Sequence, residues 1–199
     1  MSLFKTLFLL CLTLAAPRLV FAMGSMYFIE PSAGYRSHTL RLTNYTGTEN
    51  KITMASPVYG LKLGYRSMMG IDLNLAYDYS AGKAEMSPFV EKNNFSQKTA
   101  AVQLGINAMG LMKIFLGYGF MNQLDIEKGL LNSDIKLAGL AYQAGLQFKF
   151  ISFVTLGLQY NLNQFKTVSG SSYPLGEAIE TYYNKLDSQD YSASLSVSF

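Results

Sequence analysis

The last nine residues place the strongest constraint on what this chain can fold into. Tyr191–Phe199 read YSASLSVSF, with an apolar side chain at every odd position and serine at every even position. Alternation with a period of two predicts a β-strand that has one apolar and one polar face. An unpaired apolar strand at a chain end is prone to aggregate, and a closed barrel removes that edge by pairing the last strand with the first. We therefore expect a barrel that this segment closes.

The first 22 residues are predicted to be a cleaved export signal, which leaves residues 23–199 as one barrel domain. Lys5 supplies the positive start, and Leu7–Leu14 form an apolar stretch. Val20-Phe21-Ala22 has the small residue that a signal peptidase requires, so cleavage is expected after Ala22.

The remaining chain has little net charge and no cysteine. The one cysteine, Cys11, lies within the signal, so no disulfide is expected. Removing Lys5 and Arg18 lowers the formal charge from +3 to +1, which leaves no basic excess to indicate a nucleic-acid partner. The chain is 49% hydrophobic, yet no later stretch reaches a run of about 18 apolar residues. Apolar residues dispersed in this way are typical of membrane-spanning strands.

Seven further segments show a similar alternation. Together with the last one they predict strands at 26–39, 56–66, 70–80, 97–108, 113–122, 135–150, 153–164 and 183–199. The connections at 66–70, 109–112 and 151–152 are tight, and those near 40–55, 81–96, 123–134 and 166–182 are longer and polar. Short turns that alternate with long loops are typical of outer-membrane barrels. The predicted fold is all-β: an eight-stranded antiparallel up-and-down transmembrane β-barrel.

The alternation by itself does not decide which face points outward, and a soluble lipocalin-like barrel would place the apolar face inside. Glycines on the polar face favour the membrane alternative, because they suit a narrow lumen crowded with long side chains. These are Gly34, Gly60, Gly64, Gly105, Gly117, Gly119, Gly145 and Gly157. Aromatic residues also gather near the strand ends, as the girdles of membrane barrels do. Those expected toward the outer rim are Tyr35, Tyr59, Tyr77, Tyr79, Phe120 and Tyr160.

With this pattern the chain resembles the small outer-membrane β-barrel family, the OmpA/OmpX-like eight-stranded proteins. Its closing residues resemble the family's C-terminal signal for the barrel-assembly machinery; they are Tyr191, Leu195, Val197 and Phe199. The resemblance implies export to the bacterial outer membrane. It also implies contact with outer-membrane lipid and lipopolysaccharide, recognition by the assembly machinery and a monomeric barrel.

Charges of both signs lie on the polar faces. We expect Glu30, Arg66, Asp72 and Lys149 near the periplasmic end, Arg36 and Asp78 near the outer end, and Lys62 between them. One alternative is a charged pore or ion site. The other is a salt-bridged plug, which we favour because buried charges must be paired and eight strands leave a lumen that side chains can fill.

A single trio hints at catalysis. His38, Asp78 and Ser80 are expected at the outer ends of their strands, and related small barrels include lipid A acyltransferases and deacylases that use such groups. The residues beside His38 do not match those enzymes, and no metal cluster or phosphate-binding loop is visible. We therefore predict no catalytic site, no metal and no cofactor.

The predicted function is that of a non-enzymatic integral outer-membrane barrel, with a role in envelope integrity or in surface binding through four outer loops. A narrow channel for ions or small solutes is the alternative, followed by a lipid A-modifying enzyme.

Deleting Phe199 should sharply reduce the amount of barrel in the outer membrane, because the assembly machinery would lose part of its signal. Purified protein should still fold into detergent, since one half-exposed aromatic side chain contributes less than the about 1.5–3 kcal/mol of a fully buried one. Ser198→Ala is the control and should change neither property. Quantitative blotting of outer-membrane fractions measures the effect, and normal accumulation of the deletion variant would contradict it.

Overall fold

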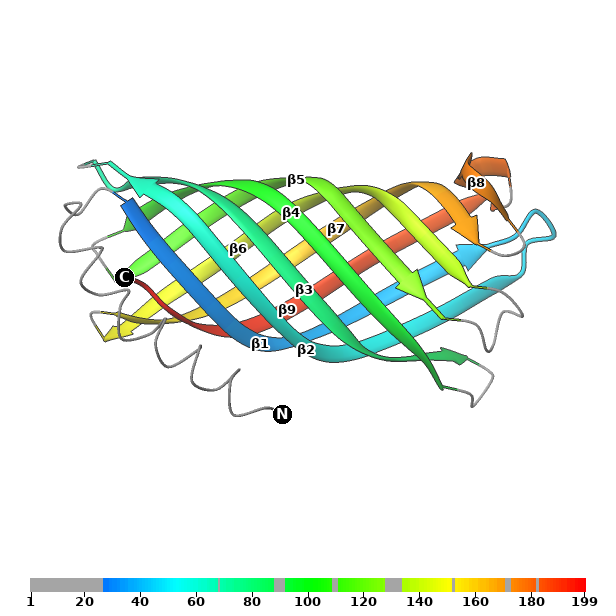
Figure 1. The fold of residues 1–199 in the computed structure, drawn as a ribbon, viewed down its shortest axis with the longest axis horizontal. Coiled ribbons are helices and arrows are strands. Elements are labelled where there is room, and N and C mark those ends of the chain that lie inside the picture. Colours follow the sequence, from blue (N-terminus) through cyan, green and yellow to red (C-terminus); the bar gives the residue numbers. More distant parts are fainter. Residues whose placement is uncertain are drawn as a thin grey trace, which may run out of the picture.

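The computed structural model is a closed barrel of long antiparallel strands (Figure 1). It describes residues 27–67, 69–87, 92–108, 111–127, 134–151, 153–170, 173–181 and 183–199. The eight barrel strands are β1 (Tyr27–Thr43), β2 (Glu49–Arg66), β3 (Ile71–Ser87), β4 (Lys92–Ala108), β5 (Met112–Ile126), β6 (Ile135–Ile151), β7 (Val154–Gly170) and β9 (Lys185–Val197). A short strand, β8 (Tyr173–Ala178), and the 3₁₀ turn η1 (Ile179–Thr181) lie between β7 and β9. In this described part, no helix is long and apolar enough to span a membrane.

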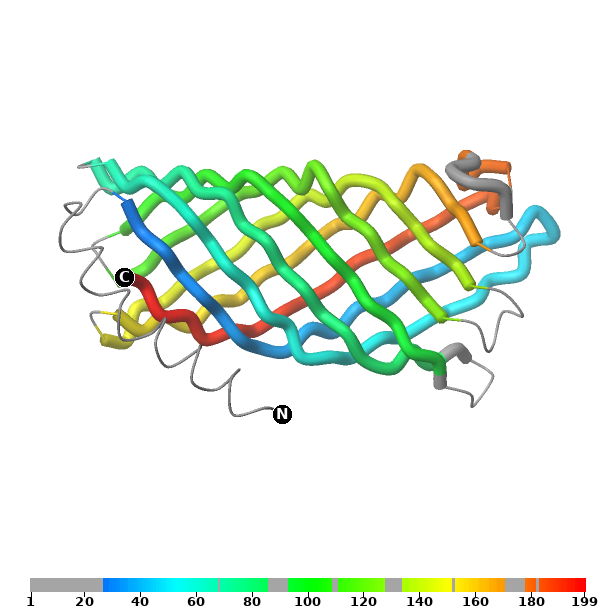
Figure 2. Tube along the Cα trace, viewed as in Figure 1, coloured from blue at the N-terminus to red at the C-terminus, as the bar shows by residue number. Residues whose placement is uncertain are grey.

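The last strand closes the barrel, as its sequence predicts. β9 pairs with β1 on one side and with β7 on the other, and Figure 2 shows the red strand lying beside the blue one. At the end of the chain, the amide of Phe199 donates to the carbonyl oxygen of Ile29 at 3.0 Å, and the amide of Ile29 donates back at 3.2 Å. The remaining neighbours follow chain order from β1 to β7.

The β2–β3, β4–β5 and β6–β7 connections and the chain terminus lie at one end of the barrel, on the left in Figure 1, and the long β7–β9 connection lies at the other end. Short turns face the periplasm in bacterial outer-membrane barrels, which assigns this end to the periplasm and the opposite end to the exterior.

The strands extend much further toward the exterior than the sequence pattern predicts. Most of the regions expected as loops near 40–55, 81–96, 123–134 and 166–182 are strand, and β1 and β2 are joined through residues 44–48 alone. The reason is a change in the lumen-facing residues, which become apolar in this region, as in Leu40, Leu42, Ile52 and Met54. Polar residues on the outward positions between them make the segment look like a loop in the sequence.

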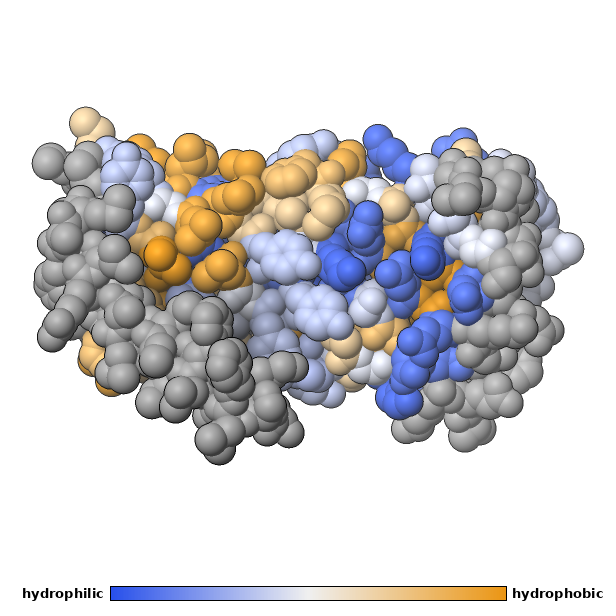
Figure 3. All heavy atoms as spheres, viewed as in Figure 1, coloured by the Kyte–Doolittle hydropathy of each residue, from blue (hydrophilic) through white to orange (hydrophobic). Residues whose placement is uncertain are grey.

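The polarity of the two faces therefore inverts along the barrel axis. In the periplasmic half the apolar face is exposed, as with Leu63, Leu73 and Leu104, and polar side chains such as Glu30 and Asp72 are buried. In the exterior half the apolar residues are inside. Figure 3 shows orange side chains on the left, pale side chains in the middle and blue side chains on the right.

An aromatic girdle marks the level of this inversion. Its exposed members are Tyr35, Tyr59, Tyr79, Phe120, Tyr142 and Tyr191. Residues 71–79 of β3 cover about 20–25 Å along the axis when a strand rises ~3.3 Å per residue and tilts by ~40°, which is close to the height of a membrane barrel's apolar band. The girdle residues expected at the outer rim thus lie near mid-barrel, and the strands continue beyond the membrane.

Glycine makes room for two inward-facing aromatic side chains, Phe28 and Phe115, which the sequence analysis did not single out. A Cβ atom built on Gly64 would lie 2.5 Å from Cζ of Phe28, and one on Gly145 would overlap the ring of Phe115. Both rings are buried in the lumen. The expectation that glycines accommodate a crowded lumen is confirmed at these positions.

Arginine substitutions on the outward face should separate the membrane half from the projecting half. Leu75→Arg should destabilise the barrel by about 2–4 kcal/mol, because Leu75 lies near the middle of the apolar band. Thr53→Arg, on the outward face of the projecting half, should change stability by about 0.5 kcal/mol or less. Reversible urea unfolding in lipid vesicles measures both values, and equal costs would contradict the assigned membrane boundary.

Candidate functional site

A buried ion cluster lies in the lumen near mid-barrel. Arg36 of β1 donates from Nη2 to Asp78 Oδ2 of β3 at 3.2 Å, and its Nε lies 3.5 Å from Asp190 Oδ1 of β9. The side chain of Arg36 is 1% exposed and that of Asp190 is fully buried. Neither charge could remain in such a site without its partners, because an isolated buried charge is very costly.

Hydrogen bonds extend this cluster across the lumen. Asn163 donates to Asp190 at 2.9 Å, Asn122 donates to Asn163 at 2.8 Å, and Gln97 donates to Asn122 at 3.1 Å. The strands involved, β4, β5, β7 and β9, lie on different sides of the barrel. The lumen is therefore bridged at this level by side chains.

His38 ends this chain of contacts. Its Nδ1 lies 3.1 Å from Gln97 Oε1, and its Nε2 lies 2.7 Å from Ser188 Oγ. Because an amide oxygen only accepts, Nδ1 carries a proton, and in the neutral imidazole Nε2 then accepts from the serine hydroxyl. We call Arg36, Asp78, Asp190, Asn163, Asn122, Gln97, His38 and Ser188 the polar network.

A second group of paired charges lies nearer the periplasm. Asp72 receives two hydrogen bonds from Arg66, at 2.9 and 3.1 Å, and one from Lys113 at 3.3 Å. Glu30 lies 3.8 Å from Lys62 Nζ and accepts a hydrogen bond from Gln147 at 2.7 Å. Glu30 and Lys62, like Arg66 and Asp72, are register partners on neighbouring strands, whereas Lys113 reaches Asp72 from a strand that is not its neighbour.

On the exterior side of the polar network, the lumen is filled by a cluster that we call the apolar plug. Its described members are Leu40, Leu42, Ile52, Met54, Ala84, Phe95, Leu124, Ile126, Ile135, Leu137, Phe165, Val168, Ile179 and Tyr183. Each is buried, and several are fully inaccessible. Ile179 of η1 and Tyr183 show that the segment between β7 and β9 packs into the same cluster. Polar outside and apolar inside, this half of the barrel is built like a soluble one.

The sequence analysis foresaw part of this site. The salt-bridged plug is confirmed as an arrangement of paired charges, and Lys62 pairs with Glu30 as a lumen charge should. Arg36 and Asp78 lie near mid-barrel rather than near the outer end, because the strands continue past them. Lys149 is exposed at the periplasmic end. The sequence analysis missed Asp190, although it shares the even positions of the serines in β9 that mark the lumen face.

The catalytic trio is not assembled. His38 bonds to Gln97 and Ser188, while Asp78 is held by Arg36, and no hydrogen bond joins His38 to Asp78 or Ser80 in the described part of the chain. Within that part, no group of three or more His, Cys, Asp or Glu side chains is placed to hold a metal ion.

The residues of the expected assembly signal lie on the closing strand. Tyr191 and Leu195 are more than half exposed on the outward face, and Val197 and Phe199 are half-buried at the periplasmic end. Tyr191 also packs on Tyr160 of β7, with ring centroids 5.0 Å apart. Their recognition by an assembly machinery stays a prediction.

A comparison with protein families finds one that spans this whole architecture. The model of the outer membrane protein beta-barrel domain matches residues 6–199. The chain belongs to this family. It is accordingly a bacterial outer-membrane protein of the Gram-negative envelope.

Solved structures share the fold of this outer-membrane barrel. Ail of Yersinia pestis, in complex with the heparin analogue sucrose octasulfate, aligns with a TM-score of 0.57 at 13% identity, covering 87% of this chain and 99% of Ail. OprG of Pseudomonas aeruginosa aligns with a TM-score of 0.52 at 12% identity, covering 87% of this chain and 96% of OprG. No curated protein sequence matches the chain significantly.

Shortening a side chain in the apolar plug should weaken this outer-membrane barrel even though the plug lies outside the membrane. Leu124→Ala should cost about 2–5 kcal/mol, because it removes buried methyl groups and leaves a cavity. Gln123→Ala, on the outward face of the same strand, should cost about 0.5 kcal/mol or less. Urea unfolding in vesicles compares them, and a mild effect of Leu124→Ala would mean that the plug is loosely packed.

Proposed function

We propose that this protein is a non-conducting, non-enzymatic barrel that anchors a rigid surface domain in the outer membrane, where it supports the envelope or contacts ligands. The observation that carries the proposal is the closure of the lumen at successive levels by paired charges, by the polar network and by the apolar plug. The membrane half serves as the anchor. The projecting half is the part available for contact.

The same closure argues against the alternative of an ion or solute channel. A permeating ion would have to separate Arg36 from Asp78 and Asp190, and separating a buried pair leaves uncompensated charge. It would then have to cross the apolar plug, where a polar solute loses its hydration without gaining partners. An apolar solute that entered from the periplasm would meet the paired charges first.

The environment of His38 supports the absence of catalysis. Its ring is 1% exposed and Ser188 is 2% exposed, and both ring nitrogens are occupied by Gln97 and Ser188. A general base must reach its substrate proton directly or through one water, which this placement does not favour.

The projecting half supplies a surface for lipopolysaccharide and other exterior partners. Its outward face carries cations that can meet phosphate groups, namely Arg41, Lys51, Lys83, Lys98, Lys136 and Lys166. Lys98 pairs in register with Tyr79 of the girdle, at the level expected for the outer headgroups. Ail, a fold neighbour, is described with a heparin analogue, which is consistent with polyanions as partners of such surfaces.

Three further parts of the proposal come from the family pattern. The protein is exported through cleavage after Ala22. It is inserted by the barrel-assembly machinery, which reads Tyr191, Leu195, Val197 and Phe199, and it acts as a monomer. Closure through β1 and β9 leaves no barrel strand of one copy needing a second copy as its partner.

Planar-bilayer recording tests whether the lumen is closed. The protein should give no steady single-channel steps of porin size, because charges and apolar side chains fill the lumen. A variant that combines Arg36→Ala, Leu124→Gly and Leu137→Gly should raise the frequency of current steps. Heat-modifiable migration on SDS gels confirms that each variant is folded. Steady porin-sized steps from the unmodified protein would contradict the proposal.

Surface accessibility tests the orientation on which the contact role depends. A protease tag inserted between Thr46 and Gly47, in the β1–β2 turn, should be cut on intact cells. A tag at Ser67, in the β2–β3 turn, should be protected until the membrane is permeabilised. These expectations follow from the short turns facing the periplasm. The opposite pattern would place the apolar plug in the periplasm.

A further inference from the structure

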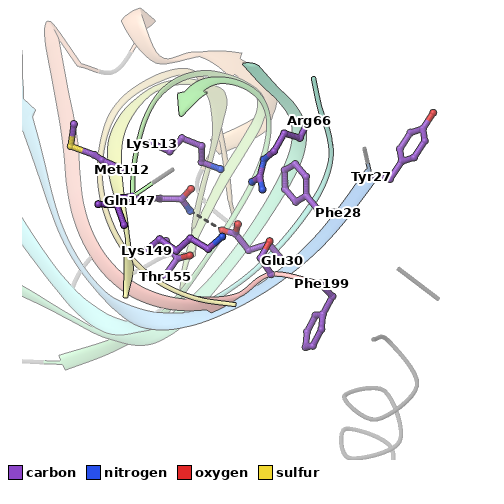
Figure 4. Close-up of a pocket in the computed structure, with 12 residues that line it drawn as sticks. Tyr27, Phe28, Glu30, Arg66, Met112, Lys113, Gln147, Lys149, Thr155 and Phe199 are labelled. Atoms are coloured by element: carbon purple, nitrogen blue, oxygen red, sulfur yellow. Dashed lines mark hydrogen bonds between the residues drawn. The ribbon is translucent and has the colours of Figure 1, made fainter. Parts of the chain in front are cut away.

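The periplasmic end of the lumen holds a cavity of about 220 Å³, which we call the periplasmic mouth (Figure 4). Arg66, Lys113, Lys149 and Glu30 line it, and in Figure 4 their side chains extend into a common space from different strands. At ~30 Å³ per water, the cavity has room for about seven waters, so a small oxyanion fits with part of its hydration shell.

The charge of this mouth is not balanced. Three cations line it against one carboxylate, that of Glu30. Adding Lys62, which pairs with Glu30, and Asp72, which pairs with Arg66 and Lys113, gives four cations against two carboxylates. Phe199 also lines the cavity, and cations remain in excess even when its terminal carboxylate is counted.

Lys149 carries the unbalanced charge. Its side chain is exposed at the mouth, and within the described part of the chain no ion pair or side-chain hydrogen bond involves it. Arg66 and Lys113, by contrast, are anchored on Asp72. A free ammonium group thus faces the same space as two cations that are held in place.

Packing holds the anchored cations ready for a ligand. The guanidinium carbon of Arg66 lies 5.2 Å from the centre of the Phe28 ring, and Lys113 Nζ lies 5.5 Å from it. Gln147 is fixed by its hydrogen bond to Glu30, and the hydroxyls of Thr155 and Ser198 also line the cavity. Groups that are already ordered lose little entropy when a ligand binds.

We propose that the periplasmic mouth binds a phosphate group through Lys149, Arg66 and Lys113. Guanidinium and ammonium groups are the side chains that bind phosphate best. The phosphate has two possible sources, free phosphate or a phosphate monoester in the periplasm, and a phospholipid headgroup of the inner leaflet. A lipid headgroup can reach the cavity, because the exposed Tyr27 at its rim is placed at the depth of the headgroups in the membrane.

The first arm of the test measures inorganic phosphate binding to the folded barrel in a non-ionic detergent, by calorimetric titration at constant ionic strength. The unmodified protein should bind phosphate. Lys149→Gln should weaken the affinity by about fivefold, as expected for the loss of one partly exposed charged contact. Lys149 has no described partner to lose, so the variant should fold normally. Lys185→Gln is the matched control and should leave the affinity unchanged, because Lys185 is an exposed cation at the exterior end of β9 that pairs with Asp187.

The second arm repeats the titration in lipid nanodiscs and counts lipids retained on the barrel by native mass spectrometry. Phosphate binding that persists in nanodiscs identifies a soluble ligand. Binding that disappears there, together with lipid retention that is lost in Lys149→Gln, identifies a headgroup. The proposal is overturned if phosphate does not bind in detergent, or if Lys149→Gln and Lys185→Gln have the same affinity as the unmodified protein.

Discussion

The pairing of β9 with β1 is the interaction on which the rest of the structure depends. A membrane interior offers no partner for an unpaired backbone amide or carbonyl group, so an open sheet edge there would be very costly. The pairing runs from Thr43 and Lys185 down to Ile29 and Phe199, and it closes the hydrogen-bonded circuit. Closure also sets the width of the lumen, since the eight strands leave an interior that side chains alone can fill.

A lumen of this width makes the polar faces depend on one another. Arg36 requires both Asp78 and Asp190, and Asp190 in turn receives hydrogen bonds from two asparagines. Removing one charged residue of this group would leave a buried charge without its partner. The loss of stability would be larger than that from replacing the whole ion pair by apolar residues. The interior is therefore built as one connected unit, and the paired charges that stabilise it also obstruct it.

The two ends of the barrel face different surroundings, and their side chains differ accordingly. Beyond the girdle the outer wall meets water and saccharide, so its apolar residues turn inward and form the plug. At the periplasmic end the lumen opens with an excess of cations around Lys149. Between the two ends the lumen is filled by buried side chains, first paired charges and then the apolar plug.

The sequence by itself determined the strand periodicity, the eight-stranded closure, the short-turn end and the outward direction of the apolar face in the membrane half. The periodicity is local, because side-chain direction alternates with every residue. Closure and the outward face were indicated instead by the apolar edge of the terminal strand and by the positions of glycine and aromatic residues. Only the tertiary structure decided the partners of each lumen charge, since Arg36 and Asp78 are 42 residues apart and meet through strand register. It also decided where the strands end. Leu40 and Met54 continue the alternation of their strands, but the surroundings outside the barrel change there from lipid to water. An interpretation that expects apolar residues on the outward face therefore ends the strands too early.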